Sequence, residues 1–113
     1  MYSRLPKVSL EDATRFLVAI DSAFKAELER EETEELTLHC VMSLFAQYFG
    51  KNGGRFSEKQ LRQLGEWLNF AVSAPGELEN AVSTCFLEHT RQLKVNQLLA
   101  PYLSKLAKEK SHA

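Results

Sequence analysis

The chain has 113 residues, of which 44% are hydrophobic and 26% charged, and its formal net charge is -1. This length predicts one domain that buries a core without disulfides or metals, and the composition argues against disorder. The charge balance argues against direct nucleic-acid binding, and no apolar run approaches the roughly 20 residues of a membrane span. The first seven residues lack the apolar stretch of a signal peptide, which indicates a cytoplasmic protein.

The first predicted helix spans residues 9–32, and Ser9 is its expected N-cap. Its apolar side chains recur every fourth position, at Phe16, Ile20, Phe24 and Leu28. This spacing is typical of an amphipathic helix with one face against a core. The apolar pattern stops at 29–35, which contains no apolar residue, so we expect the helix to end there.

A second helix is predicted over 34–49, with Thr33 as its N-cap. Apolar residues cover most of its circumference, which indicates the central and most buried helix of the fold. Phe45 lies midway along it and is expected at the centre of the core. Gly50 is the expected end.

The third helix has the clearest start, because Ser57 and Gln60 form a capping-box pattern. It should bury Leu64 and Leu68, place Trp67 at an edge of its apolar face, and end within 73–76. A fourth helix is predicted over 77–93. A short last helix follows Pro101, and its apolar residues are Tyr102, Leu103 and Leu106.

The chain shows no pattern of strands joined by a tight turn. We therefore predict an all-α fold with four principal helices plus a short C-terminal helix, in a compact bundle or orthogonal array. Residues 1–113 are expected to form a single helical domain, with 1–8 and 108–113 frayed at its ends.

The cysteines and histidines are the candidate metal ligands of the chain. Cys85 and His89 lie four residues apart, and His39 precedes Cys40 on the central helix. These residues could bind zinc only by meeting across helices, and no Cys-x-x-Cys pair supports such a site. We expect two reduced and buried thiols, no metal and no cofactor, although a Cys40–Cys85 disulfide is an alternative.

Catalytic chemistry has one candidate set, Cys85 with Glu88 and His89, which could serve a small hydrolase. The chain offers no glycine-rich oxyanion loop beside it, and Gly53-Gly54 lacks the spacing of a phosphate cradle. The sequence therefore predicts no catalytic residues and no enzyme activity.

An acidic run is the best candidate for a binding surface. Six glutamates fall within nine residues: Glu27, Glu29, Glu31, Glu32, Glu34 and Glu35. Such a corner can be plain solvated surface, but its local field can also steer a basic partner. We predict that the partner-binding residues are Glu27, Glu31, Glu32, Glu34 and Glu35.

The C-terminal third resembles a family of small, uncharacterised bacterial helical proteins. The residues that carry the resemblance are 80–83 (Asn-Ala-Val-Ser), 86–89 (Phe-Leu-Glu-His) and 99–103 (Leu-Ala-Pro-Tyr-Leu). Such proteins look like those encoded near polymorphic toxins, among which immunity proteins are common. The resemblance implies an interaction role and carries no binding or catalytic residue with it.

These observations predict a protein-binding module. The specific expectation is an immunity protein of a contact-dependent growth inhibition type, which occludes the basic active-site cleft of a nuclease toxin domain. Its acidic corner would then imitate a phosphate backbone. A homodimeric structural or adaptor subunit is the main alternative, and the hydrolase using Cys85, Glu88 and His89 is the other.

Overall fold

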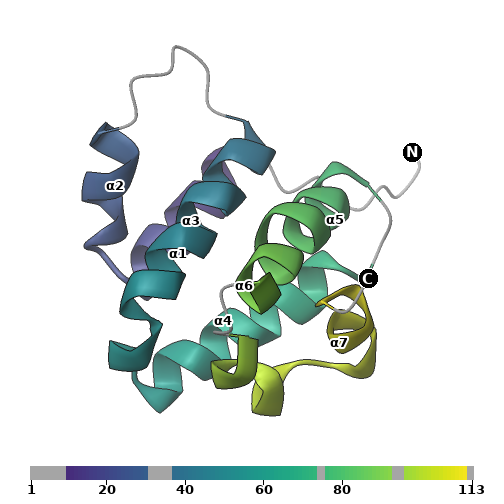
Figure 1. Ribbon diagram of the computed structural model, residues 1–113. Coiled ribbons are helices and arrows are strands. Elements are labelled where there is room, and N and C mark those ends of the chain that lie inside the picture. Colours follow the sequence, from purple (N-terminus) through teal and green to yellow (C-terminus); the bar gives the residue numbers. More distant parts are fainter. Residues whose placement is uncertain (1–9, 31–36, 74–75, 93–95, 112–113) are drawn as a thin grey trace, which may run out of the picture.

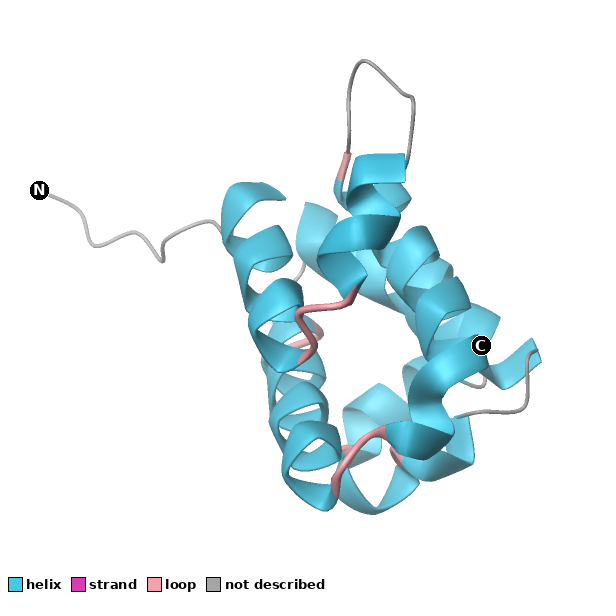
Figure 2. Ribbon diagram, turned by 90° about the vertical axis from the view of Figure 1, so that its left-hand side faces the viewer, coloured by secondary structure: helices cyan, strands magenta, loops and turns pink. Residues whose placement is uncertain are grey.

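The computed structural model describes residues 10–30, 37–73, 76–92 and 96–111 (Figure 1, Figure 2). The regular elements in these ranges are helical and none is a strand, which confirms the predicted all-α class. The α-helices are α1 (Leu10–Ile20), α2 (Phe24–Arg30), α3 (Leu38–Asn52), α4 (Glu58–Ala71), α5 (Glu77–Ala81), α6 (Glu88–Gln92) and α7 (Lys105–Ser111). The other helical segments are the π-helical η2 (Val82–Leu87) and the short 3-10 turns η1 (Gly53–Arg55), η3 (Asn96–Leu98) and η4 (Ala100–Tyr102).

The prediction of one helix over 9–32 was wrong, because α1 ends at Ile20 and α2 begins at Phe24. Asp21 makes this break. Its carboxylate accepts a hydrogen bond from the Ala23 backbone N–H at 3.1 Å and another from the Tyr48 hydroxyl at 2.7 Å. A cap of this kind starts a new helix, and the bond to Tyr48 holds the corner against α3. The expected cap, Ser9, lies outside the described residues.

The central helix α3 begins later and ends later than predicted. Thr37 is extended and its hydroxyl accepts from the Cys40 N–H, so the helix starts at Leu38 and not at residue 34. Thr33 lies outside the described residues. The helix also continues through Gly50 to Asn52. Gly53, just after the helix, is closely packed, because an added Cβ there would lie 3.0 Å from the Leu98 side chain.

Helix α4 begins as predicted. The Ser57 hydroxyl accepts from the Gln60 N–H at 3.1 Å, and the Gln60 side chain accepts from the Ser57 N–H at 2.7 Å. Leu64 and Leu68 are fully buried, and Trp67 is half-buried at the edge of this face, as expected. The helix ends at Ala71, slightly before the predicted stop.

The predicted fourth helix is present over 77–92, but its middle is π-helical. In η2 the Glu88 N–H donates to the Ser83 carbonyl, five residues back. The Thr84 hydroxyl donates to the Asn80 carbonyl at 2.7 Å, a bond that bends helices. Widening a helix by one residue changes which side chains share a face. Regular helical spacing is therefore lost within this segment.

The C-terminal prediction needs one correction. Tyr102 lies in η4 and Leu103 follows it, so neither belongs to the last helix, α7. Residues 108–111 are the second half of α7. The Ser104 hydroxyl accepts from the Ala107 N–H at 3.1 Å, and Ala107 is fully buried. This cap and this contact hold α7 in the fold.

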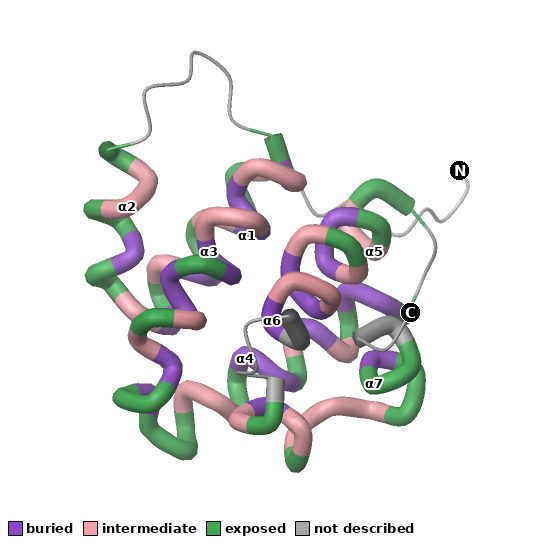
Figure 3. Tube along the Cα trace, viewed as in Figure 1, coloured by how far each residue is buried: buried purple, intermediate pink, exposed green. Residues whose placement is uncertain are grey.

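The core surrounds α3, as predicted (Figure 3). This helix contacts α1, α2, α5, η2 and α6. Phe45 is fully buried at its centre, and its ring contacts those of Phe24, Tyr48, Phe49, Phe56 and Phe86. We call these six residues the aromatic core; it holds α2, α3, η2 and the start of α4 together.

Candidate partner-binding site

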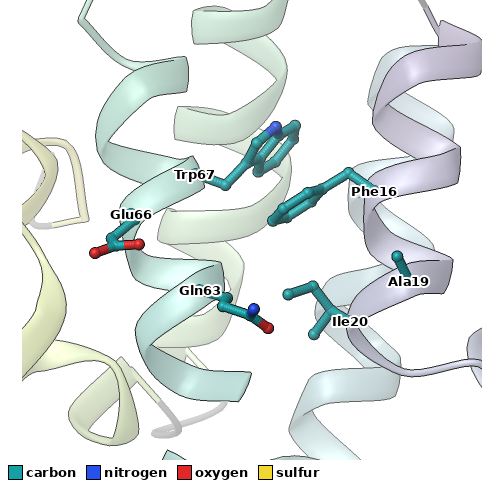
Figure 4. Close-up of a pocket in the computed structure, with 6 residues that line it drawn as sticks. All are labelled: Phe16, Ala19, Ile20, Gln63, Glu66 and Trp67. Atoms are coloured by element: carbon teal, nitrogen blue, oxygen red, sulfur yellow. The ribbon is translucent and has the colours of Figure 1, made fainter. Parts of the chain in front are cut away.

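A hollow of about 380 Å³ lies between α1 and α4 on the molecular surface (Figure 4). Its lining residues are Phe16, Ala19, Ile20, Gln63, Glu66 and Trp67. We call it the α1–α4 hollow. The rings of Phe16 and Trp67 stack across it, with centroids 4.9 Å apart and planes 17° from parallel. Both rings are only half-buried, so this aromatic pair joins the two helices while part of it faces solvent.

Two contacts fix how the helices flank the hollow. The Gln60 side chain donates to the Ile20 carbonyl at 2.8 Å, near the end of α1 and the start of α4. Further along, Phe16 meets Trp67. Moving back along α1 therefore means moving forward along α4, so the two helices are antiparallel. The hollow lies between these two antiparallel helices, and both contribute residues to its lining.

Polar groups at the hollow are free to bind a partner. Among the described residues the Trp67 indole N–H has no hydrogen-bond acceptor, and no buried side-chain polar atom there lacks a partner. The indole N–H therefore reaches solvent. Glu66 is exposed and forms no ion pair with any described residue, and the guanidinium of Arg62, one turn earlier, binds Glu58 at 2.8 Å. The hollow thus offers an apolar floor, one donor and one acidic rim.

The apolar surface continues beyond the hollow along α4. Phe70 has 56% of its surface exposed, the largest fraction among the large hydrophobic residues in the described ranges. It lies three residues after Trp67, a spacing that places two side chains on the same side of a helix. An exposed phenylalanine beside a half-exposed aromatic pair is more apolar surface than single scattered residues provide.

The predicted acidic corner is described only in part. Glu31, Glu32, Glu34 and Glu35 lie outside the described residues. Glu27 lies on α2 and binds the Arg30 guanidinium at 2.9 Å, so its charge already has a partner within the chain. Glu29 is exposed. The described part of the corner therefore contributes one paired and one exposed carboxylate.

The alternative catalytic set, Cys85 with Glu88 and His89, is not assembled within the described ranges. In the described ranges, Cys85 makes no hydrogen bond to Glu88 or His89. Its Sγ instead lies 3.2 Å from Nδ1 of His39 on α3. The π-helical segment explains the difference, because the expected pairing of Cys85 with His89 assumed regular α-helical spacing. Both cysteines are free thiols, and both are half-buried, so the expectation that they are fully buried was wrong.

No group of three or more histidine, cysteine or acidic side chains within the described ranges is arranged to hold a metal ion. The pair of His39 and Cys85 therefore has no third ligand there.

No helix among the described residues combines the length and the apolar character that crossing a bilayer requires.

One group in the described region has a strongly displaced pKa. Burial of Tyr48, followed by its hydrogen bond to Asp21 and the negative charge of that carboxylate, raises the pKa of its hydroxyl from 10.0 to about 12. Tyr48 is only 6% exposed. Its hydroxyl lies where it fixes the corner between α1 and α2, so we assign it a structural role.

Sequence reasoning placed Phe16 in the apolar stripe of its helix and Trp67 at an edge, but it did not bring them together. The pairing depends on how α1 and α4 pack against each other. The sequence does not show which helices contact one another. The available signal was the edge position of a tryptophan, which is enriched at interfaces because it offers both apolar area and a donor.

Comparison of the chain with protein-family models, curated proteins and solved structures gives no match.

Proposed function

We propose that this protein is a protein-binding module that acts by occupying a partner's surface and not by catalysis. The observation that carries the proposal is the α1–α4 hollow, with its half-exposed Phe16–Trp67 pair and free indole donor. Tryptophan and other large aromatic side chains dominate the binding energy of many interfaces when a partner buries them. A small molecule is a poorer fit, since ligand pockets usually enclose ~70–90% of their ligand, whereas exposed side chains line this hollow on both helices.

The hollow favours a particular kind of partner segment. An apolar side chain would contact the Phe16 and Trp67 rings, and a hydrogen-bond acceptor would meet the indole N–H. A lysine or arginine beside that anchor would meet Glu66, which has no ion pair among the described residues. A partner with an apolar anchor next to a basic group satisfies all three features.

We propose more specifically that the partner is a bacterial toxin domain with a basic cleft, which makes this chain an immunity protein. The resemblance of the C-terminal third and the run of glutamates from Glu27 to Glu35 support this assignment. A nuclease cleft must be basic to bind phosphates, so an acidic surface beside an apolar anchor would be attracted to it and cover it. The protein would then act in the cytoplasm, where such a toxin arrives.

The single tryptophan of the chain gives a direct test, because its fluorescence reports on the hollow. The toxin domain encoded beside this gene would be purified and titrated into the wild-type protein, with emission and nuclease activity followed together. We expect a fluorescence shift and loss of nuclease activity at the same stoichiometry. Uninhibited nuclease activity with saturating protein would reject the immunity role.

Variants locate the interface. Glu66→Lys reverses the charge at the hollow, and Glu109→Lys makes the same change in net charge at an exposed site on α7. We expect Glu66→Lys to weaken binding at least tenfold, about 1.4 kcal/mol, and Glu109→Lys to bind as wild type. Equal binding by both variants, with inhibition retained, would move the interface away from the hollow while leaving the immunity role intact.

A further inference from the structure

The pair of His39 and Cys85 lies outside the proposed binding site and joins two of the most closely packed elements. His39 is on α3 and Cys85 is in the π-helical segment η2, and both side chains are partly exposed. Nδ1 of His39 lies 3.2 Å from Sγ of Cys85. The contact spans 46 residues of chain, so only the fold creates it.

The contacts around Sγ single out His39 as the candidate base for this thiol. The Thr84 hydroxyl lies 3.6 Å from Sγ, but it donates its one hydrogen to the Asn80 carbonyl at 2.7 Å. Thr84 is therefore not a donor to Sγ in this arrangement. Nδ1 of His39 is closer and, as an imidazole nitrogen, can take the thiol proton and then donate it back as a charge-assisted hydrogen bond. Cysteine beside histidine is the usual arrangement of a reactive thiol.

The second thiol of the chain, Cys40, provides an internal comparison for Cys85. Cys40 is also a free and partly exposed thiol, next to His39 in sequence. Adjacent residues of a helix point about 100° apart, so sequence neighbours do not face one another. The described residues supply no hydrogen bond to Sγ of Cys40. The two thiols thus have similar exposure and differ in contact with a base.

We propose that Cys85, activated by His39, is a site of oxidation by hydrogen peroxide. The Cys85 proton moves to Nδ1 of His39, and the thiolate sulfur attacks one peroxide oxygen. A sulfur–oxygen bond forms as the oxygen–oxygen bond breaks. The departing hydroxide takes the proton from His39 and leaves as water. The sulfur is oxidised by two electrons to a sulfenic acid, and the peroxide is reduced by the same two electrons.

The location gives such a modification a structural effect. Cys85 immediately precedes Phe86, which is fully buried and stacks on Phe45 at 5.7 Å. An added oxygen on Sγ enlarges the side chain between α3 and η2. This change acts on the contact between the π-helical segment and the central helix.

The test uses the full-length protein with hydrogen peroxide and a sulfenic-acid trap such as dimedone. Trypsin separates the thiols, because Arg30 and Lys51 flank Cys40 while Arg62 and Arg91 flank Cys85. Mass spectrometry then gives a labelling rate for each cysteine in one sample. We expect Cys85 to react about tenfold faster than Cys40, and His39→Gln to bring its rate close to that of Cys40.

His89→Gln is the matched control, because His89 lies four residues from Cys85 and makes no hydrogen bond to it in the described region. This variant should label Cys85 at the wild-type rate. Should His39→Gln fail to fold, wild-type protein in guanidinium replaces it, and there the two cysteines should label at similar rates. Equal labelling of the two cysteines in folded wild-type protein, or an unchanged Cys85 rate in folded His39→Gln, would overturn the proposal.

Discussion

The aromatic core and the α1–α4 hollow use the same kind of side chain, an aromatic ring, for different purposes. Phe45 contacts five other rings and is fully buried, so its apolar surface stabilises the fold. Phe16 and Trp67 stack at 4.9 Å, as close as any ring pair in the core, yet both remain half-exposed. Ring contact alone therefore does not identify a core. The exposure left after the contact decides whether an aromatic pair stabilises the chain or remains available to a partner.

The largest expected effect lies in the aromatic core. Phe45→Ala removes a ring that meets rings from α2, α3, η2 and the start of α4, and it should lower the free energy of unfolding by about 3–5 kcal/mol. Denaturant titration measures this loss. Phe70→Ala, which truncates the same residue type at a 56% exposed position, should change stability by less than about 1 kcal/mol. A loss under 1 kcal/mol for Phe45→Ala would mean that the core is misplaced.

The polar edge of the core predicts a pH effect. The pKa of Tyr48 is raised to about 12 in the fold and is near 10.0 when unfolded, so folding favours its protonated form. This stabilisation is complete below pH 10 and is lost as the pH rises through 12, up to about 2–3 kcal/mol. Wild-type protein should therefore lose more stability between pH 10 and 12 than Tyr48→Phe, measured by denaturant titration. Parallel losses in both proteins would contradict this role.

Helix α4 has a close-packed face in addition to the hollow, and substituting Gly65 tests the packing of that face. A Cβ at Gly65 would lie 2.6 Å from Cβ of Tyr102 and 3.0 Å from its carbonyl oxygen. Gly65→Ala should cost about 1–3 kcal/mol, despite a helix-propensity gain near 1 kcal/mol. Gly54→Ala is the control, because its Cβ would meet nothing within 4 Å. The Tm values of the two variants should differ clearly. A Tm of Gly65→Ala at or above that of the wild type would show that η4 moves to accommodate the added Cβ.

The smallest effect on stability is expected at the acidic corner. Reversing Glu31, Glu32, Glu34 and Glu35 together should leave the helical circular dichroism intact. If these residues flank the bound toxin domain, the variant should associate more slowly and with a weaker salt dependence, while the dissociation rate changes little. Stopped-flow Trp67 fluorescence at low salt measures these rates. A wild-type association rate would leave the α1–α4 hollow as the remaining candidate surface.

The sequence determined the elements whose signals are local. Apolar periodicity placed the central helix and Phe45, and the Ser57–Gln60 capping box placed the start of α4. Both depend on residues within a few positions of one another, which helix geometry brings together in any context. The all-α class followed from the same local patterns.

Tertiary structure decided what depends on distant partners. Asp21 splits the first predicted helix partly because Tyr48 holds its carboxylate from α3. Trp67 meets Phe16 across two crossing helices, and Cys85 meets His39 where regular spacing had suggested His89. These contacts join residues 27 to 51 positions apart, and the π-helical turn shifts the register on which local reasoning relied. Periodicity identifies which face of a helix is buried, but packing alone selects the side chain that it meets.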